Sequence, residues 1–337
     1  MRKKEHPKID FVITWVDGSD PEWIKEKEKY LAQETQKTQK WASSDIRFRD
    51  WDILKYWFRA IDKYAPWVNK IYFITCGQKP FWLDENNKKL ILVNHEDFMP
   101  AKYLPTFNSN AIELNIYRIK ELSEHFVYFN DDMFLNSPTR PTDFFRNGKP
   151  VLATGFDLAR TDYGITNSDI NNAKIYNKYF SKKEVLKKNW HKILSIKNGK
   201  YLIKTLCLMP WSAITGIAEN HNPSSYTKDT FKKIWNLESE ILNKTSINKF
   251  RKPEDVNHWL AKGWHILSGE SYPQKANCSK SYAKQIDDEI IKDIIKGKHK
   301  FICINDIECS ENEFNDSKKK LINAFEQKLP EKSSFEK

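Results

Sequence analysis

The chain has 337 residues, of which 39% are hydrophobic and 14% aromatic, and this is ample apolar material for a large folded core. It contains no run of about 18 apolar residues and no apolar segment after its charged start, so neither a membrane span nor a signal peptide is predicted, and a cytoplasmic protein is expected. Five scattered cysteines indicate neither a disulfide framework nor a zinc site, and the net charge of +11 favours an anionic partner.

The first predicted element is a buried strand over residues 11–15, in the segment IDFVITWVDGSDPEW. It leads directly to Asp17 and Gly18, so an acid stands at the carboxyl end of a core strand. In open α/β sheets ligands bind at this edge, and a glycine there lets a nucleotide or phosphate approach the backbone. Asp20 followed by Pro21 is typical of a helix cap and the first helical position.

Strands and helices alternate in the next part of the chain. After a polar stretch from Thr35 to Asp45, the spacing of apolar residues predicts a helix over about 53–61 that ends before Pro66. Buried strands are predicted at three further places, residues 70–76, 89–93 and 124–129. Asn110 and Glu113 have the spacing of a capping pair that opens another helix. This alternation indicates a mainly parallel α/β sheet flanked by helices.

The pattern changes after this sheet. Residues 147–220 are rich in Asn and Lys and are predicted to be an irregular insertion or subdomain over the sheet. A helical segment follows over 221–260, and another buried strand is predicted at 300–304. The sequence therefore predicts one catalytic α/β domain over 1–310, and an amphipathic helix with a frayed end over 311–337.

Asn130, Asp131 and Asp132 directly follow the strand predicted at 124–129. Two adjacent carboxylates at a strand end are unfavourable unless a cation or a proton compensates them. Oxygen ligands of this kind suit Mg²⁺ or Mn²⁺ bridging a diphosphate. The structural alternative is an Asp-Asp turn that caps the next element.

Three further segments carry candidate chemistry. His221 offers a base near neutral pH, and Arg251 offers a fixed cation for phosphate oxygens, although each could equally be a structural residue. Asn305 and Asp306 come directly after the last buried strand and could complete a metal shell or bind a ribose or phosphate, the alternative being a strand-terminal turn.

These segments together resemble the Stealth family of sugar-phosphate transferases, which includes bacterial capsule and exopolysaccharide enzymes and the catalytic subunit of lysosomal N-acetylglucosamine-1-phosphotransferase. Four motifs of that family are recognised in order. They are IDFVITWVDGSDPEW; the region from about Arg47 through YFNDDMFL; the region from HNPSSYTKD to KFRKPEDVNHWL; and FICIND.

The resemblance implies a nucleotide-sugar-binding fold similar to type-A glycosyltransferases, and transfer of a hexose-1-phosphate from a UDP-sugar to a hydroxyl of an oligosaccharide or lipid-linked saccharide, with release of UMP. The predicted catalytic residues are Asp131, Asp132, His221 and Arg251. The predicted nucleotide-sugar-binding residues are Trp15, Asp17, Gly18, Asn130 and Asn305. Asp132 and Asp306 are the predicted ligands of Mg²⁺ or Mn²⁺.

Several alternatives stay open at the level of sequence. His221 is the favoured general base, with Asp131 or Asp132 as the alternative. An ordinary glycosyltransferase would attack the anomeric carbon and release UDP instead of UMP. A non-catalytic polyanion-binding protein would also suit the positive charge, although nucleic acid is not the predicted partner. The lysine-rich C-terminal helix could touch the inner membrane face or simply be solvated.

Overall fold

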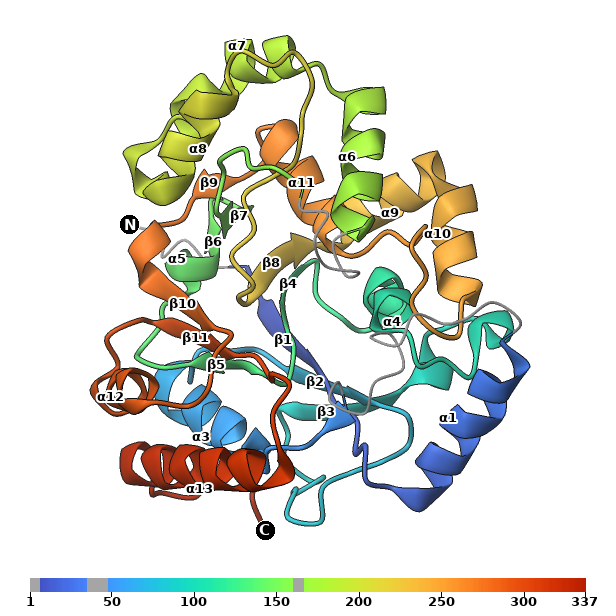
Figure 1. Cartoon of the computed structure of the whole chain (residues 1–337), viewed down its shortest axis with the longest axis vertical. Coiled ribbons are helices and arrows are strands. Elements are labelled where there is room, and N and C mark those ends of the chain that lie inside the picture. The colour runs from blue at the N-terminus through green and yellow to red at the C-terminus, as the bar shows by residue number, and fades with distance from the viewer. Residues whose placement is uncertain (1–6, 35–47, 160–166) are drawn as a thin grey trace.

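The structure is a computed structural model that describes residues 7–34, 48–159 and 167–337. Its centre is a five-stranded sheet in the order β3-β2-β1-β4-β8, in which β1 to β4 are parallel and β8 is antiparallel to β4 (Figure 1). The strands are β1 (Ile9–Thr14), β2 (Ile71–Thr75), β3 (Leu90–Asn94), β4 (His125–Phe129) and β8 (Ser224–Thr227). The predicted parallel α/β sheet is confirmed, whereas the polar stretch predicted from Thr35 to Asp45 lies outside the described residues.

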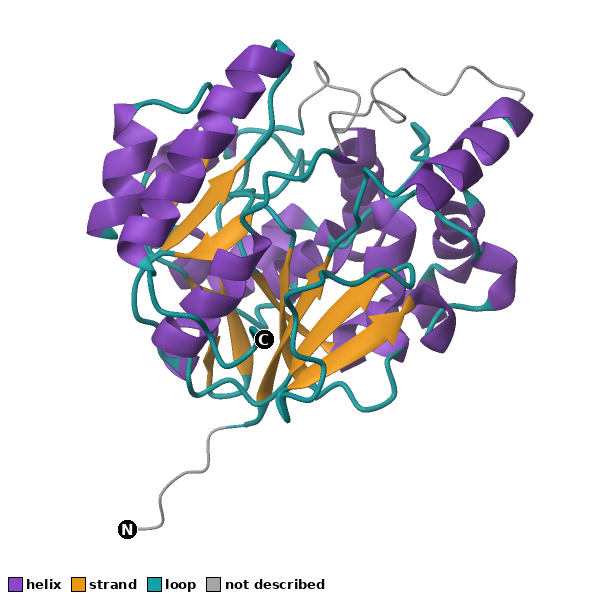
Figure 2. Cartoon of the chain, turned by 90° about the horizontal axis from the view of Figure 1, so that it is seen from below, coloured by secondary structure: helices purple, strands orange, loops and turns teal. Residues whose placement is uncertain are grey.

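Helices cover both faces of this sheet (Figure 2), so its inner strands are buried along almost their whole length. Phe11 and Ile13 on β1 belong to the same apolar cluster as α3 (Leu54–Tyr64). Val12, between them, belongs to a second cluster on the opposite face. The helices that contribute to that second cluster include α4 (Ser109–Asn115), α9 (Lys228–Leu237), α10 (Ser239–Ile247) and α11 (Trp259–Leu267).

Two helix starts test the capping predictions. α1 (Pro21–Gln33) begins as predicted, because Asp20 accepts a hydrogen bond from the Glu22 backbone N–H at 3.0 Å. The capping pair predicted for α4 is wrong. Asn108 caps this helix, and Glu113 is buried within it beside the edge of the sheet. The spacing of Asn110 and Glu113 alone could not distinguish a glutamate that caps the helix from one that is buried.

A second, three-stranded sheet consists of β10 (Ser279–Tyr282), β11 (Phe301–Ile304) and β5 (Met133–Leu135), with α12 (Asp288–Lys296) between β10 and β11 in the chain. β5 begins directly after Asp132 and runs antiparallel to β11. The Ile304 N–H donates to the Asp132 carbonyl at 2.9 Å. This pairing brings the residues that follow β11 to the same place as the residues that follow β4.

Residues 147–220, predicted to be irregular, contain regular elements. They include β7 (Lys149–Leu152), α6 (Asn167–Tyr179), α7 (Lys182–Ile193) and α8 (Lys200–Leu208). β7 pairs with β6 (Phe145–Arg146), which follows α5 (Pro141–Phe144), and with β9 (Tyr272–Pro273) in a small third sheet. These helices were not predicted because the segment is rich in Asn and Lys, and its apolar residues do not repeat at a clear helical spacing. That this segment is an insertion or subdomain stays a prediction.

The C-terminal helix is confirmed as α13 (Glu311–Lys328), and its apolar side packs on the core cluster that contains α3. The frayed end predicted after it is wrong. Phe335 is fully buried, and Glu336 forms a bidentate pair with Arg59 at 2.8 and 2.9 Å. Within the part of the chain that the structure describes, no helix has both the length and the apolar character needed to cross a bilayer.

Candidate active site

A cavity of about 380 Å³ opens at the carboxyl edge of the central sheet, where β1, β4 and β11 end. β1 and β4 are in register, with Ile13 opposite Phe129, so the residues that follow each strand emerge together. Its lining includes five aromatic side chains, those of Trp15, Trp23, Phe48, Trp51 and Phe107. The predicted site residues that line the cavity are Trp15, Asn130, Asp131, Asp132, His221, Arg251, Asn305 and Asp306.

The paired acids lie in the turn between β4 and β5. Asp131 lines the cavity and is exposed to it. Neighbouring protein atoms desolvate its carboxyl group, and this effect, together with the charges of Asp132 and Asp50, raises the pKa of Asp131 to about 7. The turn therefore presents to the cavity one carboxyl group that can hold or release a proton near neutral pH.

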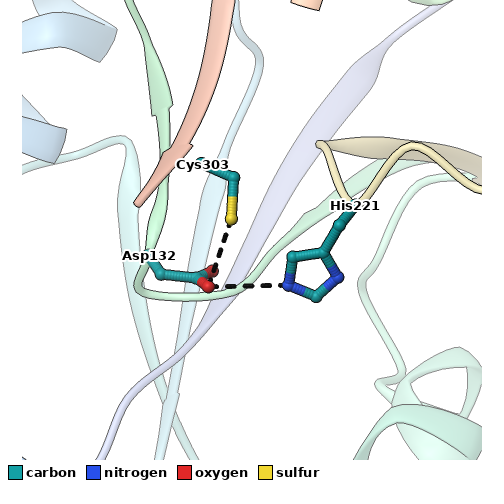
Figure 3. A group of neighbouring side chains, drawn as sticks. All are labelled: Asp132, His221 and Cys303. Atoms are coloured by element: carbon teal, nitrogen blue, oxygen red, sulfur yellow. Dashed lines mark hydrogen bonds and ion pairs between the residues drawn. The ribbon is translucent and has the colours of Figure 1, made fainter. Parts of the chain in front are cut away.

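Asp132 contacts side chains from two distant parts of the chain (Figure 3). His221 Nε2 lies 3.5 Å from Asp132 Oδ2, and the Cys303 thiol donates to the same oxygen at 3.2 Å. Burial alone would lower the pKa of His221, but the interaction with Asp132 outweighs it and raises the pKa above its ordinary value. Burial and Asp132 raise the pKa of Cys303 well above its usual range, so its thiol is neutral.

Arg251 lines the cavity, is partly buried and belongs to a polar network. Its guanidinium donates to Ser109 Oγ at the start of α4, and Glu113 supplies the nearest opposing charge. Burial lowers the pKa of Arg251 and raises that of Glu113. Glu113 in turn accepts from the Tyr128 hydroxyl at 3.3 Å and lies 3.7 Å from His258 Nε2. The hydrogen bond to Ser109 and the charge of Glu113 hold the guanidinium in place.

Asp306 and Asp50 also line the cavity. Arg49 binds Asp306 with two hydrogen bonds, from Nε at 2.8 Å and from Nη2 at 2.6 Å. Asp50 accepts from Trp15 Nε1 at 3.3 Å, and burial raises its pKa. Asn305 lines the cavity, and its amide donates to Ser281 Oγ at 2.9 Å. The metal-binding role predicted for Asp306 stays a prediction, and it would require the pair with Arg49 to rearrange.

Asp17 and Gly18 are not among the residues that line the cavity. The Asp17 carboxylate accepts hydrogen bonds within its own turn, from the Ser19 N–H at 2.9 Å and the Ser19 hydroxyl at 2.6 Å. A Cβ on Gly18 would lie 2.0 Å from the Phe48 carbonyl oxygen. Glycine is therefore required at position 18 for packing, because a side chain there would clash with the Phe48 backbone. The nucleotide-binding role of Asp17 and Gly18 stays a prediction.

A hard divalent cation fits part of this site. Asn130 Oδ1 and Asp132 Oδ1 are buried at the strand edge and accept no hydrogen bond from any described residue. With the Asp131 carboxylate, they form an all-oxygen donor set of the kind that Mg²⁺ or Mn²⁺ prefers. The alternative group of Asp132, His221 and Cys303 also converges, but it contains a buried neutral thiol, which does not suit these two cations.

The tertiary structure also adds residues to the site that the sequence did not assign to it. Glu113 was predicted only as part of a helix cap, and Arg49, Asp50 and Cys303 were not predicted as site residues. A signal was present for Arg49 and Asp50, which stand together in the segment RFRDWD before α3. For Glu113 the only hint was a carboxylate among the apolar residues of a helix.

Two segments of the chain match models of a protein family. Residues 7–35 match the conserved region 1 of Stealth proteins, and residues 47–152 match their conserved region 2. The second match includes the turn with the paired acids and the helix that carries Glu113. The chain belongs to the Stealth family, and it is a transferase.

Relatives match along the whole chain. The chain is 46% identical to the capsular polysaccharide phosphotransferase WcwK of Streptococcus pneumoniae, with 99% of both chains covered. It is 41% identical to the exopolysaccharide phosphotransferase cps2G of Lactiplantibacillus plantarum, covering 98% of this chain and 96% of the relative. It is also 41% identical to the receptor polysaccharide phosphotransferase WefC of Streptococcus oralis, covering 98% and 99%.

Among solved structures the similarity is weaker. The bifunctional glycosyltransferase WbbM matches with a TM-score of 0.39 and 9% identity, over 98% of this chain and 53% of that one. The galactosyltransferase LgtC, solved with donor and acceptor sugar analogues, matches with a TM-score of 0.36 and 8% identity, over 92% and 95%. The family assignment rests on the sequence relatives.

Proposed function

We propose that this protein transfers a hexose-1-phosphate from a nucleotide sugar to a sugar hydroxyl in the synthesis of a capsular or exopolysaccharide, and that it releases a nucleoside monophosphate. The names of the relatives that match along the whole chain support phosphotransfer in polysaccharide synthesis. The donor proposed is a UDP-sugar, and the acceptor is an oligosaccharide or a lipid-linked saccharide. A cytoplasmic location remains part of this proposal.

The convergence of the predicted catalytic groups in one cavity is the observation that carries the proposal. Asp131 and Asp132 follow β4, His221 precedes β8, and Arg251 follows α10. These groups are a proton acceptor, a fixed cation and two acids, which phosphoryl transfer needs together. A surface that only binds polyanions has no use for two carboxylates at its centre, so the cavity favours a transferase over a non-catalytic basic protein.

In the proposed reaction, the acceptor hydroxyl attacks the β-phosphorus of the donor. The new bond joins the acceptor oxygen to that phosphorus, and the bond from the phosphorus to the bridging oxygen of UMP breaks. His221 takes the hydroxyl proton. Its Nε2 is oriented by Asp132, and Nδ1 has no hydrogen-bond partner among the described residues, so Nδ1 is the atom offered to the acceptor.

Arg251 binds the oxygens of the transferring phosphoryl group. Its position is fixed through Ser109, and the counter-charge of Glu113 offsets part of the cost of its burial. A divalent cation at Asn130, Asp131 and Asp132 would supply positive charge to the donor diphosphate. The aromatic side chains that line the cavity offer flat apolar surface against which a nucleotide base or sugar ring can stack.

The released nucleotide tests the proposal directly. Purified protein is incubated with a panel of nucleotide sugars, Mg²⁺ and an oligosaccharide acceptor, and the products are separated by chromatography. We expect UMP together with a new phosphodiester in the acceptor. Release of UDP with a new glycosidic bond would place the attack at the anomeric carbon and refute the mechanism. A His221→Asn variant is the matched control, because any release that it retains is not catalysed through this base.

A further inference from the structure

Exposed apolar side chains are concentrated on one helical hairpin. This α7–α8 hairpin comprises residues 182–211, namely α7, α8 and the turns that join and follow them. Half of the exposed large apolar side chains of the described chain lie in its second part: Trp190, Ile196, Ile203, Leu206, Met209 and Trp211. Scattered single residues of this kind are ordinary, but such a concentration marks an interaction surface.

α8 has a second apolar face in addition to the one that packs on the protein. Its inner face, Tyr201, Thr205 and Leu208, is buried at helical spacing. Ile203 and Leu206 lie on the other side of the helix and are 66% and 52% exposed. The inner face of α8 therefore packs on the rest of the protein, whereas its outer apolar residues are not covered by any described part of the chain.

The hairpin is also held firmly in shape. The buried Lys182 ammonium at the start of α7 donates to the carbonyls of Leu208 at 2.6 Å and Trp211 at 2.7 Å, at the end of α8. These contacts tie the start of one helix to the end of the other. Thr205 Oγ1 accepts from the Phe156 N–H at 2.8 Å, which anchors the inner face of α8. The outer face is thus presented on a rigid support.

Positive charge accompanies the apolar side chains. Residues 182–211 contain eight lysines and a single acidic residue, Glu184, so this short hairpin accounts for most of the net charge of +11. The exposed lysines are Lys183, Lys187, Lys188, Lys197, Lys200 and Lys204. An apolar face edged by lysines, with tryptophans among its exposed residues, has the chemistry of a segment that lies in the headgroup layer of an anionic bilayer.

The position of the hairpin suits the proposed acceptor. Lys200 and Lys204 on α8 line a second cavity of about 250 Å³, together with Glu219 and Trp259. Trp259 contacts the His221 ring edge-on at 6.0 Å between centroids. The hairpin is therefore connected to the active site on the side of the proposed base.

We propose that the outer face of the α7–α8 hairpin docks this protein on the surface of an anionic lipid bilayer. Ile203, Leu206 and the neighbouring tryptophans enter the headgroup layer, and the exposed lysines bind lipid phosphates. This assignment replaces α13, whose apolar side is already packed on the core, as the membrane-contacting element.

Flotation with lipid vesicles tests the proposal independently of catalysis. The full chain is mixed either with vesicles of phosphatidylcholine alone or with vesicles made of equal parts of phosphatidylcholine and phosphatidylglycerol. We expect binding to the anionic vesicles that weakens as salt is added. A variant with Ile203→Ser and Leu206→Ser should partition roughly tenfold less, because it loses the buried apolar area. Phe81→Ser, at an 89% exposed position outside the hairpin, is the matched control and should bind as the parent does.

The lysines are tested in the same assay. Each lysine near an anionic surface contributes about a fivefold change in binding. The triple variant Lys183→Gln, Lys187→Gln, Lys188→Gln should therefore bind at least tenfold less, whereas Lys319→Gln with Lys320→Gln on α13 should change binding little. Equal loss in both variants would indicate a general charge effect and overturn the assignment.

A label reports the docking geometry independently of affinity. Cys207 is exposed on α8 beside the outer apolar residues, and it can carry a polarity-sensitive fluorophore in a Cys76→Ser background. We expect a blue shift on anionic vesicles. An unshifted spectrum with bound protein would show that another surface docks. Loss of self-association in the Ile203→Ser, Leu206→Ser variant without any vesicle binding would assign the face to a second copy instead.

Discussion

Arg251→Lys is the substitution that tests the active site most sharply. Lysine keeps the positive charge but replaces the forked guanidinium with one nitrogen. In the structure Arg251 already donates to Ser109 Oγ, and its other nitrogens remain available to the cavity that it lines. A lysine at this position cannot both hold Ser109 and donate twice to phosphoryl oxygens.

The expected loss depends on the hydrogen bonds that remain. One hydrogen bond to a charged group contributes about 1.5–3 kcal/mol, which corresponds to a kcat about 10- to 150-fold lower when the bond is made in the transition state. The loss should appear in kcat more than in KM, because charge on the transferring oxygens changes during the reaction. Release of the nucleotide is measured over a range of donor concentrations.

Two controls separate catalysis from folding. Arg146→Lys changes an exposed arginine on β6 that donates to the Thr142 carbonyl, and it should leave kcat unchanged. Thermal unfolding of Arg251→Lys should remain close to that of the parent protein, because the partly buried positive charge is kept. Full activity of Arg251→Lys, or a change in KM alone, would refute the role of this residue as a clamp on the transferring group.

Three further outcomes are expected. Gly18→Ala should destabilise the fold by about 1–3 kcal/mol in denaturant unfolding, because its Cβ would meet the Phe48 carbonyl oxygen at 2.0 Å. A higher KM for the donor with unchanged stability would instead support contact between Gly18 and the nucleotide. Hydrogen bonds from Arg59 and Ser333 outweigh the effect of burial and hold the pKa of Glu336 below its ordinary value. The stability that this carboxylate contributes is therefore fully present above that ordinary value and is lost as pH falls through the folded-state pKa. Glu336→Gln should cost about 3 kcal/mol at neutral pH and flatten the acid limb of the stability curve; a variant as stable as the parent would show that the tail is not anchored by this pair. Chelation should abolish nucleotide release, and Mg²⁺ or Mn²⁺ should restore it; undiminished turnover in chelator would remove the cation from the proposed site.

The local sequence determined the strands and the polar groups at their ends. Runs of apolar residues with a polar group at the end located β1, β4 and β11, and the parallel pairing of β1 with β4 then required their ends to meet at one edge. For this reason the sequence alone was enough to place Asp131 and Asp132 at the carboxyl edge of the sheet. The cap of α1 was equally predictable, because a cap involves only neighbouring residues.

Only the tertiary structure decided which side chains meet. Cys303 and Asp132 are 171 positions apart, and Arg251 and Ser109 are 142 apart, so their contacts depend on sheet order and on the path of long connections. No local pattern encodes such a contact, because the periodicity of a segment depends only on residues that are close together in the sequence. The same reason explains why Glu113 proved to be buried beside Arg251, and why the tail that looked frayed is anchored by Arg59.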